Sequence, residues 1–224
     1  MTMPHTSHWI VPSLNLLASI LLLISFAMLS RRRTQRLITL YAWQGLVLFV
    51  STCLVAYSSG QKELVYSAGL TLMLKVIALP WILHRLIQRL GAQWDSELLV
   101  NIPTTMLVGL GLVIFAFGLA QPISMMANTI TRNTLGIALA VILLSFLMMI
   151  TRRKAVTQVI GFLAMENGLF FAATSATYGM PMVIELGIAL DLLVAVFILG
   201  IFFFQIREQF DSLDLHHLET LKED

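Results

Sequence analysis

The chain has 224 residues, of which 58% are hydrophobic and only 12% are charged. Its mean hydropathy of +0.87 lies far above the range of soluble domains, which predicts a polytopic, all-α integral membrane protein. The formal net charge of +2 indicates little by itself. The single cysteine, Cys53, lies in an apolar run, so an internal disulfide is excluded.

Apolar segments long enough to cross a bilayer recur along the chain. A hydrocarbon core of about 30 Å needs a helix of about 20 apolar residues. Seven segments meet this length: 9–30, 37–58, 64–83, 98–119, 129–150, 156–178 and 182–204. We expect the first to remain as a helix rather than to be removed as a signal peptide. Breaks at 58–60, 121–122 and 179–181 contain Ser, Gly or Pro and fit loops on one side of the membrane.

Basic residues indicate the orientation of these helices. They cluster after the first, third, fifth and seventh segments, so a seven-helix thread brings the clusters to one side of the membrane. The positive-inside rule makes that side cytoplasmic, which predicts an outer N-terminus and an inner C-terminus. Lys62 and Arg132 then lie outside. The clustered residues are Arg31, Arg32, Arg33, Arg36, Arg85, Arg89, Arg152, Arg153, Lys154, Arg207 and Lys222.

The first three segments match the last three when the two sets are aligned. Ser25 and Phe26 match Ser145 and Phe146, each pair preceding a basic cluster. The stretch 44–46 (QGL) falls beside 166–169 (ENGL), and the stretch 69–75 overlays 185–191, so that Lys75 aligns with Asp191. Both units start on the same side, so we expect parallel repeats related by an axis along the membrane normal.

This alignment predicts four parts of the chain. Residues 1–91 form the first three-helix repeat, and residues 92–126 form a linking fourth helix. Residues 127–206 form the second three-helix repeat. Residues 207–224 form a cytoplasmic tail, where leucines at mixed helical spacing favour a short amphipathic helix.

Three carboxylates lie inside or at the edge of the last two apolar segments: Glu166, Glu185 and Asp191. A charge at the bilayer centre costs roughly 2.5 to 3.5 kcal/mol on insertion scales, so such an acid normally faces protein or a water-filled cavity. Glu166, near the middle of its helix, is the first candidate for a proton path. The alternative is a structural acid that is hydrogen-bonded to a neighbouring helix. Glu185 is either an outer port or an interfacial residue.

Two basic side chains are the remaining candidates for a proton path. Lys75 lies inside the third segment, and it either pairs with Asp191 or stands in its own half of a charge relay. Pro80 is expected to kink the helix just beyond Lys75. His84, at the cytoplasmic end of the same helix, marks either an inner port or a belt of basic residues at the interface.

Motifs for other chemistry are absent from the sequence. It has no P-loop, no dinucleotide fingerprint, no Cys or His cluster with metal-ligand spacing, and no nucleophilic triad worth proposing. We therefore expect no catalytic residues, cofactor or metal in this chain. Any redox chemistry is expected on other subunits.

Four passages resemble a known family: 67–80 (SAGLTLMLKVIALP), 161–168 (GFLAMENG), 184–191 (IELGIALD) and 212–222 (SLDLHHLETLK). In these the chain resembles component E of hydrogenase-4, a membrane subunit of formate hydrogenlyase-type complexes. Its last three helices resemble the K subunit of respiratory complex I and the C subunit of Mrp antiporters.

The resemblance implies roles for individual residues. Glu166 looks like the first of two glutamates along which protons are thought to move in the complex I subunit. Asp191 lies about one turn from the second. Lys75 belongs to the hydrogenase-type pattern, and Gln44 stands near the place of Glu166 in the first repeat.

The resemblance also implies a setting. The chain would be a non-catalytic, multi-pass subunit of the inner (cytoplasmic) membrane that contributes to proton or ion translocation coupled to electron transfer. Its partners would be antiporter-like membrane subunits and a peripheral hydrogenase arm carrying the [NiFe] centre and iron–sulfur clusters, with no nucleic acid. The alternatives are a purely structural bridge between antiporter-like subunits, and a subunit of a stand-alone Mrp-type cation antiporter.

Overall fold

The structure, a computed structural model, describes residues 7–59, 62–89, 99–126 and 129–177, together with Gly187 and Val194. Its regular elements are helices, as the sequence predicts. They are α1 (Ser7–Ser30), α2 (Thr34–Ser59), α3 (Lys62–Thr71), η1 (Leu72–Ala78), α4 (Leu79–Arg89), α5 (Ile102–Met126), α6 (Thr129–Thr151) and α7 (Ala155–Thr177).

Helices α3, η1 and α4 follow one another without a break and form a single rod. The residues at both junctions, Thr71 and Leu79, have right-handed helical backbone angles. Counting this rod once, the described residues contain six helices long and apolar enough to cross a membrane. They correspond to the first six predicted segments.

The seventh predicted segment, 182–204, lies outside the described residues except at two positions. Gly187 and Val194 are both helical, and Val194 is buried in the main hydrophobic cluster with 4% of its surface exposed. The cytoplasmic tail and the predicted loop at 179–181 also lie outside the described residues.

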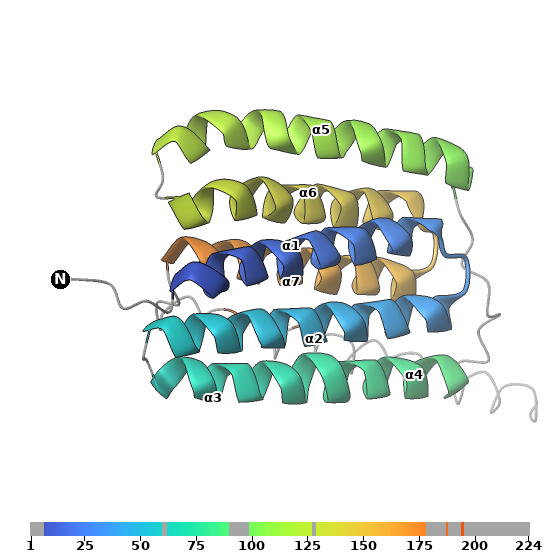
Figure 1. Ribbon diagram of the computed structural model, residues 1–224. Coiled ribbons are helices and arrows are strands. Elements are labelled where there is room, and N and C mark those ends of the chain that lie inside the picture. The colour runs from blue at the N-terminus through green and yellow to red at the C-terminus, as the bar shows by residue number, and fades with distance from the viewer. Residues whose placement is uncertain are drawn as a thin grey trace, which may run out of the picture.

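The helices run side by side as a bundle (Figure 1). Helix α5 lies along one edge and packs on α6, while the rod α3–η1–α4 lies along the opposite edge and packs on α2. Helices α1, α2, α6 and α7 form the centre, with α1 against α6 and α2 against α7. The centre of the bundle therefore brings the first two helices of each predicted repeat together.

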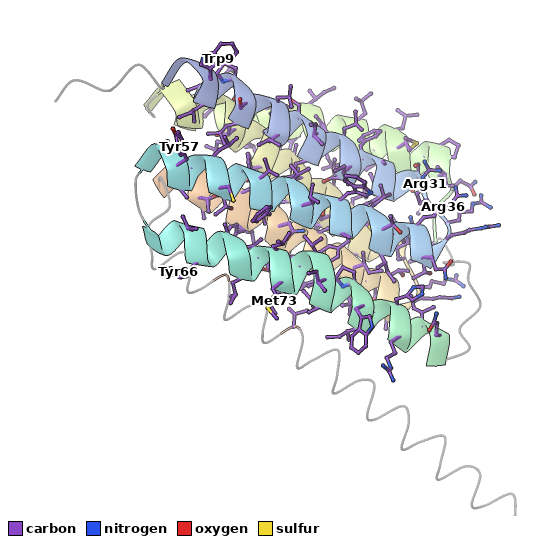
Figure 2. All side chains as sticks on the ribbon, turned by 60° about the horizontal axis from the view of Figure 1, so that its bottom comes forward. Trp9, Arg31, Arg36, Tyr57, Tyr66 and Met73 are labelled. Atoms are coloured by element: carbon purple, nitrogen blue, oxygen red, sulfur yellow. The ribbon has the colours of Figure 1, made fainter. Side chains whose placement is uncertain are left out.

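The outer surface of the bundle fits a membrane. Trp9, Tyr57 and Tyr66 lie toward one end and are 79%, 76% and 79% exposed, while the exposed Arg31 and Arg36 lie at the other end (Figure 2). Aromatic side chains gather at membrane–water interfaces, and Lys and Arg gather on the cytoplasmic side. The two ends of the bundle thus have the composition of two different interfaces.

Arg152 joins the basic ends of α1 and α6. It follows α6 directly, is 1% exposed, and its Nη2 donates to the carbonyl oxygens of Met28, Leu29 and Arg31 at 3.3, 3.2 and 2.7 Å. The last carbonyls of a helix lack intrahelical donors and carry partial negative charge, so a guanidinium stabilises this end of α1. Burial lowers the pKa of Arg152 to about 10, which leaves it charged at neutral pH.

Two prolines test the predicted limits of the fourth span. The loop predicted at 121–122 is wrong, because α5 continues through Pro122 to Met126. A proline inside a helix removes one backbone hydrogen bond, and membrane helices tolerate this because neighbouring groups and local adjustments satisfy the freed carbonyl. Pro103 is the second residue of α5, where its missing N–H would have had no intrahelical partner.

Candidate functional site

An ion pair is buried in the middle of the bundle. The Lys75 Nζ lies 2.7 Å from Glu166 Oε1, and the two side chains are 1% and 5% exposed. Lys75 comes from η1 and Glu166 from α7. Removing two such charges from water costs several kcal/mol each, and only close geometry with further hydrogen bonds offsets that cost.

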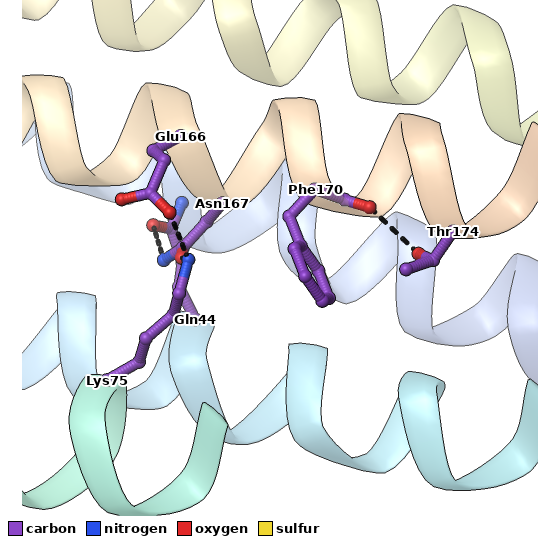
Figure 3. Close-up of polar contacts among 6 residues, drawn as sticks. All are labelled: Gln44, Lys75, Glu166, Asn167, Phe170 and Thr174. Atoms are coloured by element: carbon purple, nitrogen blue, oxygen red, sulfur yellow. Dashed lines mark hydrogen bonds and ion pairs between the residues drawn. The ribbon is translucent and has the colours of Figure 1, made fainter. Parts of the chain in front are cut away.

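Further hydrogen bonds extend from Lys75 to helix α1 (Figure 3 shows the part between Lys75 and Gln44). Lys75 Nζ also donates to Asn167 Oδ1 at 3.0 Å, and Asn167 Nδ2 donates to Gln44 Oε1 at 3.5 Å. Gln44 Nε2 donates to Ser25 Oγ at 2.7 Å, and Ser25 Oγ donates to the Leu21 carbonyl at 2.8 Å. We call Asn167, Gln44 and Ser25 the amide chain.

The amide chain is as well buried as the ion pair. Asn167 and Gln44 are 0% exposed and Ser25 is 3% exposed. Buried polar groups are expensive unless they are hydrogen-bonded, and here each of the three has a partner on another helix or on its own helix backbone. The site is therefore a connected polar layer across four elements of an apolar bundle.

The winding of the rod brings Lys75 to the inner face. From Thr71 onward, its buried residues recur every fourth position: Thr71, Lys75, Leu79, Leu83 and Ile87. In an α-helix each step of four overshoots a full turn by about 40°, so this spacing drifts around the helix. The π-helical segment η1, with more residues per turn, reduces that drift around Lys75.

Pro80 in the rod and Gly45 on the neighbouring helix α2 both suit the π-helical segment around Lys75. The Leu79 N–H donates to the Leu74 carbonyl, which is the five-residue step of a π-helix. Pro80 has no N–H to continue that ladder, so the proline predicted to kink the rod lies where the π segment ends. Gly45 on α2 faces Lys75 and leaves room for the backbone of the rod to approach.

An aromatic ring borders the Lys75 ammonium. Nζ lies 5.3 Å from the centroid of the Phe170 ring, one turn along α7 from Glu166. The ring also lies against Gly187, where an added Cβ would be 2.7 Å from Phe170 Cδ2. Phe170 thus connects the ion pair with the predicted seventh segment.

The structure brings together two of the five predicted site residues, Lys75 and Glu166. His84 is exposed on α4, where Gln88 Nε2 lies 3.0 Å from its Nε2, and no described contact joins it to the ion pair. Glu185 and Asp191 lie outside the described residues. A direct contact between Lys75 and Asp191 therefore stays a prediction.

Sequence reasoning missed the amide chain as part of the site. Gln44 was used only to align the repeats, Asn167 only as a neighbour of Glu166, and Ser25 only as a repeat marker. Polar side chains in the middle of apolar segments were the available signal, because each needs a partner once buried. The described residues contain no group of three or more His, Cys, Asp or Glu that could hold a metal ion.

Together these observations define the class: an all-helical protein whose six long apolar helices, among the residues described, are compatible with a multi-pass membrane protein with a charged pair in its interior. The chain is 33% identical over 204 residues to the "Uncharacterized protein Rv0085" of Mycobacterium tuberculosis, covering 91% of this chain and 93% of that protein. At this identity and coverage, the chain belongs to the same family as that protein.

More distant relatives carry a functional name. The chain is 25% identical over 209 residues to "Hydrogenase-4 component E" of Escherichia coli K12, with 93% of this chain and 96% of that protein covered. The protein of the same name from Shigella flexneri matches equally well. No family model matches the chain, and no solved structure matches it. The likeness to hydrogenase-4 component E is thus distant but extends over nearly the full length.

Proposed function

We propose that this chain is a non-catalytic membrane subunit of a hydrogenase-4-like, complex I-related assembly, and that its buried charges take part in proton translocation coupled to electron transfer. The distant full-length homology to hydrogenase-4 component E supports membership of a hydrogenase-type complex. The single observation that carries the proton role is the ion pair between Lys75 and Glu166.

The chemistry of the pair supports this role. Ionisable residues inside a membrane span are costly to insert and commonly mark ion or proton paths. A carboxylate can accept and release a proton, and an adjacent ammonium stabilises its charged form. Glu166 is therefore proposed as the residue that carries the proton, with Lys75 as its counter-charge.

The same geometry favours one rival function. Ser25, Gln44 and Asn167 all have partners, and a well-bonded polar layer is also what a purely structural joint requires. In that case the chain would bridge antiporter-like subunits without moving protons. The two functions differ in whether Glu166 must exchange a proton.

The proposal includes the arrangement in the membrane. We take the chain to have seven spans in the inner membrane, with the N-terminus outside, the C-terminus inside, and two parallel repeats around an axis along the membrane normal. The pairing of α1 with α6 and of α2 with α7 supports such an axis, because equivalent helices meet there. Gln44 and Asn167, which the alignment places together, approach to 3.5 Å.

Purification of the tagged chain from its native membranes tests the assembly. A hydrogenase-4-like role predicts that nickel, iron and hydrogenase activity co-purify with the chain, since the cofactors are proposed on partner subunits. An assembly of antiporter-like subunits without these metals would instead favour a stand-alone cation antiporter and contradict the proposal.

Glu166→Gln in the purified complex tests the proton role. The amide keeps the size of the side chain and an oxygen for Lys75 but cannot exchange protons at accessible pH. Proton translocation is expected to fall while hydrogenase activity with an artificial electron acceptor remains. Unchanged translocation would favour the structural bridge.

A further inference from the structure

We infer that Lys75 keeps its proton while Glu166 gains and loses one, and that the amide chain of Asn167, Gln44 and Ser25 is what holds Lys75 in the charged state. This inference rests on the proposed function and assigns separate roles within the pair. Lys75 is a fixed cation, Glu166 is the exchanging group, and the three amide-chain residues are positioning residues.

The direction of the hydrogen bonds supports this assignment. An ammonium group has donors only, so Asn167 must turn its carbonyl oxygen toward Lys75. Its NH2 group then points to Gln44, which must accept with its own oxygen and donate to Ser25. Both amide dipoles are thereby oriented with their negative ends toward Lys75, and such dipoles favour a positive charge there.

The far end of the chain is fixed by the backbone of α1. The Ser25 hydroxyl donates to the Leu21 carbonyl, so its oxygen is left to accept from Gln44. Reversal of either amide would set two donors or two acceptors against each other. Because Gln44 and Asn167 are 0% exposed, bulk water does not reach them to relieve such a mismatch.

The Phe170 ring also stabilises the Lys75 ammonium, and this contact does not involve Glu166. The Phe170 ring centroid lies 5.3 Å from Lys75 Nζ, within the range in which the face of an aromatic ring attracts an ammonium. Neither the Asn167 oxygen nor the Phe170 ring depends on the charge of Glu166 for its contact with Lys75, so both stay available when the carboxylate becomes a neutral acid. The ammonium therefore keeps partners in both states of Glu166.

The transfer step follows from these contacts. A hydronium ion, or a protonated group that acts in its place, gives a proton to the Glu166 carboxylate, so that an O–H bond forms and water or the neutral donor is left. The bond to hydrogen breaks again when the next acceptor takes the proton. No N–H bond of Lys75 breaks in either direction.

Substitutions of Lys75 test the fixed cation directly. Arginine stays protonated in proteins, whereas methionine has similar length and no charge. With proton uptake measured in lipid vesicles containing the purified complex, we expect Lys75→Arg to stay within about threefold of wild type and Lys75→Met to lose at least about tenfold. A Lys75→Arg complex that assembles normally but falls to the level of Lys75→Met would overturn the inference.

Substitutions of Asn167 test the fixed-cation role of Lys75 while the charged side chains of Lys75 and Glu166 stay in place. They keep the inference testable if arginine does not fit at position 75. Asn167→Leu removes the oxygen that faces Lys75 and is expected to lower uptake at least about tenfold, while Asn167→Gln keeps an amide oxygen for Lys75, an NH2 group for Gln44 and most of the uptake. Wild-type uptake in Asn167→Leu, or an equal loss in Asn167→Gln, would contradict a positioning role. A matched control is Thr174→Val, because this buried hydroxyl of α7 bonds to the carbonyls of Phe170 and Phe171 on its own helix.

Glu166→Gln separates this inference from the proposed function. If Glu166→Gln keeps wild-type uptake, the proton role itself fails. If Glu166→Gln loses uptake and Lys75→Arg, properly assembled, loses it as well, the proton role stands and Lys75 must exchange its proton too.

Discussion

Gly45 lies directly against Lys75, and the absence of a side chain at Gly45 sets how closely α2 and the π-helical segment pack. A Cβ at Gly45 would be 3.1 Å from Lys75 Cβ and 3.3 Å from the Lys75 carbonyl oxygen. Such contacts are tighter than side chains ordinarily make, so the rod would have to shift. The reach of Lys75 to Glu166 therefore depends on a residue that makes no polar contact with either.

Gly45→Val should destabilise the bundle because the valine methyl groups meet the backbone of η1. Overpacking of a close interface costs about 1 to 3 kcal/mol, and we expect the thermal midpoint of the detergent-solubilised protein to fall accordingly. Size-exclusion chromatography after heating measures this. The matched control is Gly111→Val on α5, where an added Cβ meets nothing within 4 Å. Equal losses in the two variants would contradict the close packing.

Arg152→Met should weaken the join between α1 and α6. The substitution removes the guanidinium from the carbonyls of Met28, Leu29 and Arg31. Buried acceptors that lose their donor cost about 1 to 3 kcal/mol, so a loss of that order is expected in the free energy of unfolding. The neighbouring Arg153 is exposed, and Arg153→Met should change stability by no more than about 0.5 kcal/mol. Similar effects of the two substitutions would argue against the capping role.

The proposed orientation predicts on which side of the membrane each loop lies. Cysteines placed at Arg32 and Lys62, in a Cys53→Ala background, should react with a membrane-impermeant maleimide from opposite sides. We expect Lys62→Cys to be labelled from outside the cell and Arg32→Cys only after the cytoplasmic side is opened, because Lys and Arg clusters stay inside. The reverse pattern would overturn the proposed threading.

Much of the helical framework was readable from the sequence because apolar length is a local property. The first six predicted segments have counterparts among the described helices, and the limits of α6 and α7 agree within about one residue. The loop at 121–122 was the failure. Pro122 predicts a break by its local chemistry, but α5 continues through it, because the surroundings of a membrane helix can satisfy the carbonyl that the proline leaves without a donor.

The sequence pointed to the two charged residues of the buried pair, but not to the contact between them or to the amide chain. Burial and charge marked Lys75 and Glu166 individually, but they are 91 positions apart, and only the packing of the rod and α7 near α2 reveals them as partners. The π-helical winding had a signal in the four-residue spacing of the buried face. That spacing becomes visible only once burial is known, because Thr71 and Lys75 are polar and do not read as core residues.

Proton uptake by the purified complex in lipid vesicles, normalised to assembled protein and measured for a Glu166 series, tests the central claim most directly. If Glu166 carries the proton, Glu166→Gln loses at least about tenfold and Glu166→Asp keeps part of the uptake, because aspartate retains an exchangeable proton on a shorter side chain. A structural acid predicts a different order, with Glu166→Gln neutral and Glu166→Ala damaging through the cavity and lost hydrogen bonds. Wild-type uptake in Glu166→Gln would contradict the account.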